Sequence, residues 1–154
     1  MTILLDIDGV LVTTPSWQKP EFLSDGFMKF NDSSAKNLAF ILDKTKASIV
    51  LTTTHRTNHS IDNWKTLLAN RGIVTSEITI INNKTSLTEF SDRLTEIKEW
   101  VHLYGDHNKY VIIDDDSSLQ DLPMAIKSNW VKTSPLIGLD DEATDKVMAI
   151  LITN

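Results

Sequence analysis

Short apolar runs alternate along the chain with longer stretches in which apolar residues recur every three to four positions. The short runs predict buried strands, which are expected at 2–5, 48–51, 77–81, 110–113 and 130–133. The periodic stretches predict helices, which are expected over 32–46, 61–71, 89–104 and from about 140 onwards. Asp32 or Ser33 is the expected cap of the first helix, and Ser60 is the expected cap of the second. Strands that alternate with helices favour an α/β fold with a mainly parallel central sheet.

Residues 12–31 interrupt this pattern, because they contain Pro15, Pro20 and Gly26 and show no regular spacing of apolar residues. We expect an irregular flap over the first strand. Its large apolar residues are expected to pack the flap against the core and not to contact a substrate; they are Trp17, Phe22, Phe27, Met28 and Phe30.

Length and composition limit the classes of protein that fit the chain. The 154 residues suggest one domain, 1–154, with a full core. No apolar run approaches the roughly 18 residues of a membrane span, so no membrane partner is expected. The absence of cysteine excludes disulfides and thiolate metal sites and fits a cytoplasmic protein. The net charge of -6 argues against a broad nucleic-acid-binding surface, although it leaves room for a local one.

Acidic residues follow two of the expected strands. Asp6 and Asp8, with Gly9 after them, come at the end of the first strand, and the run Asp114-Asp115-Asp116 comes at the end of the fourth. The carboxyl ends of parallel strands are where α/β proteins bind ligands. Like charges held close together repel each other unless a cation lies between them, and Mg²⁺ prefers such oxygen ligands. We therefore expect a Mg²⁺ site, with Asp116 serving only in the turn or as a cap.

The run Asp6-Ile7-Asp8-Gly9-Val10 resembles the first motif of the haloacid dehalogenase (HAD) superfamily, DxDGV. The resemblance implies a Rossmann-like three-layer sandwich of the HAD type, without a sizeable cap domain. It also implies that Asp6 is the nucleophile that accepts a phosphoryl group and that Asp8 is the general acid/base. The metal ligands that it implies are Asp6, Asp114, Asp115 and, through its backbone carbonyl, Asp8.

Two further motifs of the superfamily bind the phosphoryl group. A hydroxyl at the end of the second strand is expected within Thr52-Thr53-Thr54, where the repeated threonine leaves the register open and Thr53 is favoured over Thr52. A lone Lys or Arg is expected near the start of the helix over 89–104, where Arg93 is the candidate, followed by Lys98 and Lys84.

A narrower resemblance concerns one branch of the superfamily. The runs 96–100 and 111–116 and the pair Gly138-Leu139 are similar to the HAD domain of Swiss Army Knife RNA repair-like proteins. That branch commonly has Ser-Ser-Trp-Arg in its second motif, where this chain has Thr53-Thr54-His55-Arg56. His55 is interpreted as a polar loop residue or a proton carrier, and Arg56 as a surface charge or a phosphate ligand.

The resemblance implies a Mg²⁺-dependent phosphomonoester hydrolase that works through an aspartyl-phosphate intermediate. A site without a cap is open, which favours a large phosphorylated substrate such as a nucleic-acid end. A nucleotide is the alternative substrate. The alternative is a HAD-fold binding or regulatory module with little catalytic activity.

Overall fold

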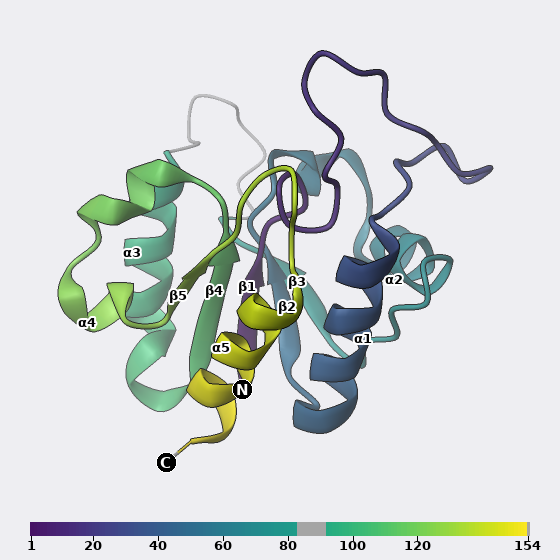
Figure 1. The fold of residues 1–154 in the computed structure, drawn as a ribbon. Helices are drawn as coiled ribbons and strands as arrows, with labels where there is room; N and C mark the ends of the chain where they lie inside the picture. The colour runs from purple at the N-terminus through teal and green to yellow at the C-terminus, as the bar shows by residue number, and fades with distance from the viewer. Residues whose placement is uncertain (83–91, 154) are drawn as a thin grey trace.

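The computed structural model describes residues 1–82 and 92–153, and its centre is a sheet of five strands (Figure 1). Every pair of neighbouring strands is parallel, and the strand order is β3-β2-β1-β4-β5. The strands are β1 (Thr2–Leu5), β2 (Ser48–Leu51), β3 (Ile78–Ile80), β4 (Tyr110–Asp114) and β5 (Trp130–Lys132). The predicted α/β fold with a parallel sheet is confirmed.

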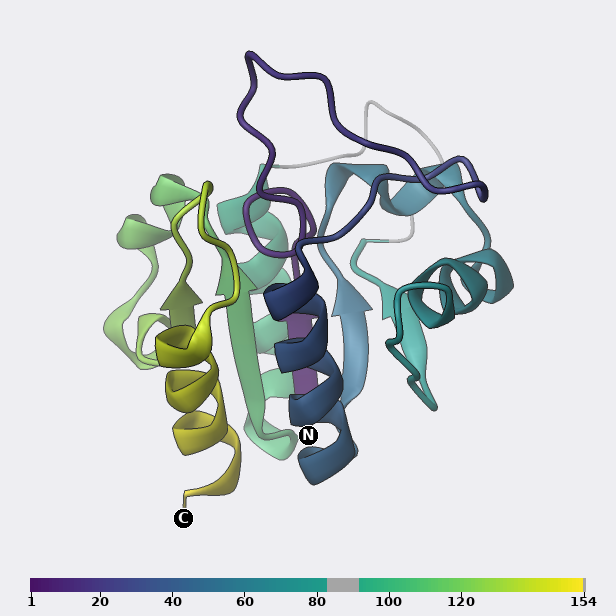
Figure 2. The ribbon, with the colours of Figure 1, turned by 45° about the vertical axis from the view of Figure 1, so that its right-hand side comes forward.

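Helices cover both faces of the sheet and complete a three-layer sandwich (Figures 1 and 2). One face carries α1 (Asp32–Thr45), α2 (Ile61–Ala69) and α5 (Asp141–Ile152). The other face carries α3 (Arg93–Tyr104) and the short α4 (Met124–Lys127). Three short 3₁₀ helices complete the described part of the chain: η1 (Thr54–Asn58), η3 (Gly105–His107) and η4 (Ser117–Asp121).

The alternation of side chains along the strands explains the two cores. In β1, Ile3 and Leu5 point into the core beneath α1, α2 and α5. Leu4 points to the opposite face and packs with Ile97 and Trp100 of α3. Because successive side chains of a strand point to opposite faces, a strand that is apolar throughout needs helices on both sides.

The order of the strands positions the candidate site. From β1, the chain continues through α1 to β2 on one side, and β4 later pairs with the other side of β1. The connections leave β1 and β4 in opposite directions, which makes the space between their carboxyl ends the switch point of the sheet. The register aligns Leu5 with Ile113, so Asp6 and Asp114 follow as neighbours.

Helix boundaries differ from the expectation at some ends. The cap of α1 is Asn31, whose side chain accepts a hydrogen bond from the Ser34 amide, and not Asp32 or Ser33. The backbone amide of Asn31 donates to the Leu11 carbonyl, so a contact with the core decides which of three adjacent polar residues caps the helix. Ser60 caps α2 as predicted. The helix predicted from residue 89 is described from Arg93, and residues 89–91 lie outside the described residues.

The flap between β1 and α1 has an outgoing half, residues 12–20, and a returning half, residues 21–31 (Figure 2). Phe27, Met28 and Phe30 of the returning half are buried, as predicted. Trp17 of the outgoing half and Phe22 of the returning half are exposed, to 76% and 56%. The expectation that all these residues pack on the core is therefore wrong for Trp17 and Phe22.

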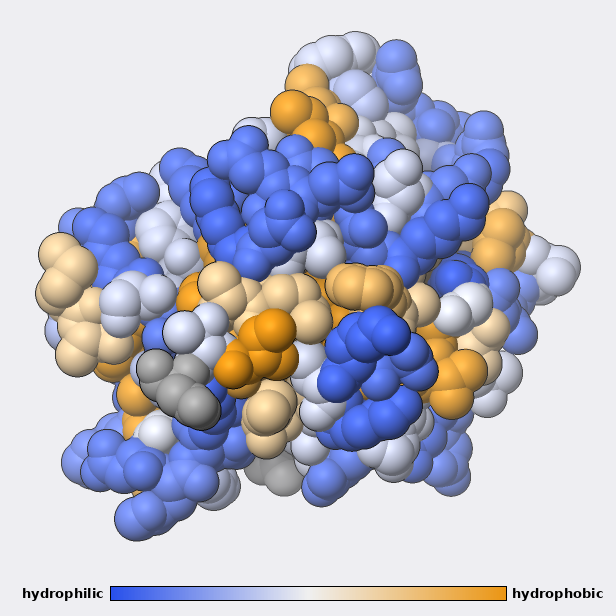
Figure 3. Space-filling model, turned by 60° about the horizontal axis from the view of Figure 1, so that its bottom comes forward, coloured by the Kyte–Doolittle hydropathy of each residue, from blue (hydrophilic) through white to orange (hydrophobic). Residues whose placement is uncertain are grey.

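The surface mixes polar and apolar residues. Seen with the bottom of the molecule turned forward, apolar residues reach the surface between larger hydrophilic areas (Figure 3). Among residues 1–82 and 92–153, no helix has both the length and the apolar character that a membrane crossing requires.

Candidate active site

Three carboxylates converge at the switch point. Asp6 directly follows β1, Asp114 is the last residue of β4, and Asp115 follows it. One carboxylate oxygen of each lies within 4.8 Å of the others. Asp6 and Asp114 are buried, whereas Asp115 is half-buried. The structure thus brings together three of the four residues that were predicted to bind a metal.

Arg93 completes the cluster from the first turn of α3. Its guanidinium lies 3.5 Å from the Asp6 carboxylate and donates a hydrogen bond to Asp114. The Asp92 side chain caps this helix by accepting from the Thr95 amide, which fixes the turn that carries Arg93. Of the two alternative cations, Lys98 is exposed to solvent, and Lys84 lies outside the described residues.

The electrostatics of the cluster are unfavourable for its negative charges. Burial raises the pKa of Asp6 to about 8, and the Asp114 carboxylate adds to this rise, while Arg93 opposes it. Burial and the same neighbour also raise the pKa of Asp115. Burial alone would lower the pKa of Arg93, but Asp114 and Asp6 raise it above its usual value. One guanidinium therefore does not balance three acids, and a cation would relieve the remaining repulsion.

Gly9 leaves room for this cluster. It has a φ of +78°, and a Cβ built on it would overlap the carboxylate of Asp115. The Gly9 carbonyl accepts a hydrogen bond of 2.7 Å from the Thr133 hydroxyl, which ties this turn to the segment that follows β5. Glycine is needed here for both its backbone conformation and its missing side chain.

Asp8 lies apart from the three converging carboxylates. Its side chain is 54% exposed, and its Oδ2 lies 2.9 Å from Nε2 of His55. The His55 ring in turn packs edge-on against Phe27 of the flap. His55 is therefore more than a polar loop residue, because it contacts the residue that was predicted to be the general acid/base.

The threonine run is sorted by burial and hydrogen bonding. Thr52 and Thr53 are fully buried, whereas Thr54 is exposed. The Thr53 hydroxyl accepts a hydrogen bond from the His55 amide and so caps η1. This bond uses a lone pair of the hydroxyl oxygen and leaves its proton available for donation. The buried Thr52 hydroxyl has no hydrogen-bond partner among the described residues.

Arg56 is not a surface charge, which corrects one of the two interpretations of this residue. It is buried and forms an ion pair of 2.7 Å with Glu96 of α3, which is also buried. Arg56 also donates to the backbone carbonyls of Thr52 and Thr53. The pair therefore fixes the turn that carries the candidate phosphate-binding hydroxyls.

A comparison with known protein families agrees with this geometry. The family model of the HAD domain in Swiss Army Knife RNA repair proteins matches residues 2–144. The chain belongs to this family. No protein with a curated function matches it.

Sequence reasoning did not anticipate two contacts of this HAD domain. The pairing of Arg56 with Glu96 joins residues forty positions apart on different elements, and nothing in the sequence near Glu96 identifies its partner. The contact between His55 and Asp8 joins a residue of η1 to a residue of the loop after β1. The one available signal was the position of His55 in the second motif, where the branch commonly has Trp.

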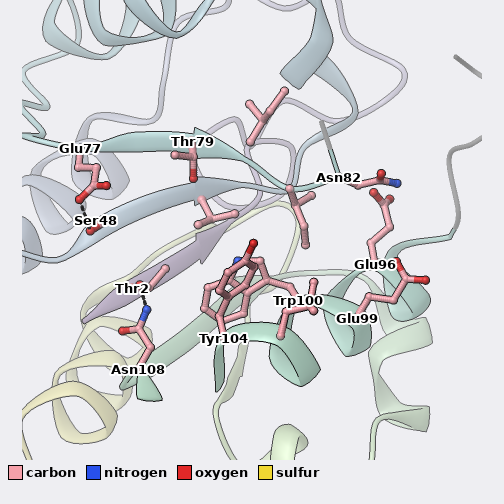
Figure 4. Close-up of a pocket in the computed structure, with 14 residues that line it drawn as sticks. Thr2, Ser48, Glu77, Thr79, Asn82, Glu96, Glu99, Trp100, Tyr104 and Asn108 are labelled. Carbon is pink, nitrogen blue, oxygen red and sulfur yellow. Dashed lines mark hydrogen bonds between the residues drawn. The ribbon is translucent and has the colours of Figure 1, made fainter. Parts of the chain in front are cut away.

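A separate groove of about 650 Å³ lies between α3 and the β2–β3 side of the sheet (Figure 4). Trp100, Tyr104 and Glu99 line it from α3, and Thr79 lines it from β3. None of the converging aspartates of the HAD domain lines this groove. Glu96 is shared between the groove and the pair with Arg56.

Proposed function

We propose that this HAD domain is a Mg²⁺-dependent phosphomonoester hydrolase that works through an aspartyl-phosphate on Asp6. The observation that carries the proposal is the convergence of the Asp6, Asp114 and Asp115 carboxylates within 4.8 Å, with Arg93 beside them. The membership of a HAD family supports a hydrolase-type enzyme. Hydrolysis of a phosphomonoester is the reaction for which a nucleophilic Asp beside a metal-binding pair is suited.

The donor set fits Mg²⁺. Asp6, Asp114 and Asp115 offer only carboxylate oxygens, which are the hard ligands that Mg²⁺ prefers. The space left by Gly9 allows the Asp115 carboxylate to approach the turn closely. Asp6, Asp115, Asp114 and the backbone carbonyl of Asp8 would hold the ion. When bound, Mg²⁺ neutralises charge, so that an anionic carboxylate can approach an anionic phosphate.

The chain's own residues account for two chemical steps. In the first, a carboxylate oxygen of Asp6 forms a bond to phosphorus, the bond to the leaving oxygen breaks, and Asp8 protonates that oxygen. In the second, water attacks the phosphorus, Asp8 takes the proton, and the bond to Asp6 breaks to release phosphate. Thr53 and Arg93 donate to the phosphoryl oxygens in both steps, and Thr52 is the alternative hydroxyl.

The substrate of this proposal is a phosphorylated nucleic-acid end or a nucleotide. The family name refers to RNA repair, and the segment between β1 and α1 is a flap that is too short to form a cap domain around a small substrate. An open site admits a large substrate whose terminal phosphate reaches Asp6.

The test is turnover of p-nitrophenyl phosphate and of 5′- and 3′-phosphorylated oligonucleotides, with and without Mg²⁺. We expect turnover that needs Mg²⁺ and that Asp6→Asn abolishes while circular dichroism and the melting temperature stay close to wild type. Asp116→Asn is the matched control. Asp116 caps η4 by accepting from the Ser118 amide, and Asn can do the same.

Two results would contradict the proposal. Turnover that persists in Asp6→Asn would reject the nucleophile. Absence of turnover in the wild-type protein, together with Mg²⁺ binding by calorimetry, would favour a HAD-fold binding module instead.

A further inference from the structure

The outgoing half of the flap presents an aromatic side chain to solvent. Trp17 lies in a turn that is closed by a hydrogen bond of 3.0 Å from the Gln18 amide to the Pro15 carbonyl. Its side chain is 76% exposed, the second highest exposure among the large apolar residues described. Phe22 in the returning half is also exposed, to 56%, whereas Phe27 and Phe30 of the same half are buried.

The returning half is attached to the body of the protein. Residues 21–29 fold into a small hairpin, in which the Lys29 amide donates to the Glu21 carbonyl. Arg71 forms a two-pronged salt bridge with Asp25 and also donates to the Met28 carbonyl. The Arg71 guanidinium stacks over the Phe27 ring as well. The hairpin of the returning half is therefore anchored by Arg71, while the outgoing half carries an uncovered tryptophan.

The flap starts at the candidate active site. Asp8 forms an isolated β-bridge with Val12, and the flap leaves the core at this point. Trp17 follows five residues later, so its Cα lies at most about 18 Å from Val12, given the reach of an extended chain. The flap stands above the carboxyl ends of the strands, at the same edge as the aspartates (Figure 2). A polymer bound at Asp6 by its terminal phosphate would pass within reach of this half of the flap.

We propose that Trp17 is a stacking platform for a nucleobase of a single-stranded nucleic acid, close to the terminal phosphate that enters the site. This inference rests on the proposed phosphatase function and adds a base-binding residue to it. Every base has a π face, and an aromatic side chain can stack on it whatever the sequence.

The charge of the chain makes stacking the more suitable form of recognition. With a net charge of -6, the protein is a poor match for a long phosphate backbone. Lys19 is exposed two residues after Trp17. The Lys29 ammonium lies 3.8 Å from the Glu21 carboxylate, which offsets its charge. We therefore expect the contact to involve the end of a strand, with little gain in affinity beyond the first few nucleotides and a weak dependence on salt.

The first measurement is binding in the Asp6→Asn background, so that it does not depend on turnover. The probes are fluorescently labelled single-stranded oligonucleotides with a terminal phosphate, either complete or lacking the base of the terminal nucleotide and the next one. Trp17→Ala should weaken binding of the complete probe by about 5- to 100-fold, the range expected for one stacked base. Trp17→Phe should restore most of the affinity.

Phe40→Ala is the matched control, because Phe40 is an exposed aromatic residue, 47% exposed, on α1. It should leave binding unchanged. Removal of the bases should weaken wild-type binding by about the same factor as Trp17→Ala, and the two changes combined should weaken it no further, because both remove the same contact.

The second measurement is turnover with Asp6 intact. Trp17→Ala should lower kcat/KM for the oligonucleotide while hydrolysis of p-nitrophenyl phosphate stays within twofold of wild type. Equal losses on both substrates, unchanged binding in Trp17→Ala, or additive losses from base removal and Trp17→Ala would each overturn the inference. Wild-type protein that binds the probe through Trp17 but hydrolyses neither substrate would instead reject the proposed phosphatase function.

Discussion

Removal of Glu96 is expected to destabilise the fold and to loosen the turn that carries the candidate phosphate-binding threonines. Glu96 and Arg56 have side chains that are 4% and 6% exposed, and they pair at 2.7 Å. Glu96→Ala leaves the Arg56 charge buried without this partner. Arg56 also donates to the Thr52 and Thr53 carbonyls, so the geometry of this turn depends on the position of its guanidinium.

The magnitude follows from the burial of the pair. Breaking a buried ion pair by removing one partner costs about 3–5 kcal/mol. A protein of this size loses about 2–4 °C in melting temperature per kcal/mol. We therefore expect Glu96→Ala to lower the melting temperature by roughly 10 °C. Alanine favours helices, so the substitution itself does not weaken α3.

Differential scanning calorimetry of two variants on the same helix checks this reasoning. Glu99→Ala removes an exposed carboxylate three residues away and should change the free energy of unfolding by less than about 0.5 kcal/mol. The double variant Arg56→Met with Glu96→Leu replaces the pair by apolar side chains and should recover much of the lost stability. It should not recover phosphatase turnover, because the contacts to the threonine carbonyls are gone. A loss below about 3 °C in Glu96→Ala would refute the view that this pair is structural.

Three further outcomes are expected. Gly9→Ala should abolish Mg²⁺ binding measured by calorimetry, because the backbone of Gly9 has a positive φ and a Cβ there would overlap the Asp115 carboxylate. His55→Ala should lower kcat about 10-fold, because Asp8 loses its contact, while the melting temperature changes by less than about 2 °C, since the pair is partly exposed. Arg71 lowers the pKa of Asp25 from its ordinary 3.8. The salt bridge therefore stabilises the fold above about pH 4 and loses this effect as the pH falls further, so the melting temperatures of wild type and Asp25→Asn should converge in acid.

The strands could be predicted because they are buried on both faces. Continuous apolar runs leave few alternatives, and 2–5 and 48–51 are reproduced to the residue by β1 and β2. Helix ends were less predictable, because they depend on contacts made elsewhere. Arg71, expected to be the last residue of α2, instead donates to the Leu67 carbonyl and to Asp25 of the flap. The helix ends at Ala69, two residues earlier.

The convergence of Asp6, Asp114 and Asp115 could be predicted because acids that follow buried strands have few structural roles. Arg93 was the first choice among three cations, and it lies beside Asp6. Its role in phosphoryl transfer stays a prediction. Glu96 could not be predicted as buried, because its partner Arg56 lies forty positions away on another element. The buried side chains of α3 are Glu96, Ile97 and Trp100, so a charged residue lies on the face that packs on the sheet.

The contacts that were not predicted share one physical feature: they attach loops to rigid elements. The turn after β2 is attached to α3 through Arg56 and Glu96. The flap is attached through Asp25 to Arg71, which follows α2 and donates to the Leu67 carbonyl of that helix. The loop that carries Asp8 is attached to η1 through His55. The sheet alone brings Asp6 and Asp114 together, because neighbouring strands fix their register. The candidate hydroxyl and acid/base groups lie outside the strands, where each needs a side-chain contact to keep its position. We infer that the motifs carry the chemistry, whereas these pairs determine how accurately the groups from different loops are aligned with Asp6.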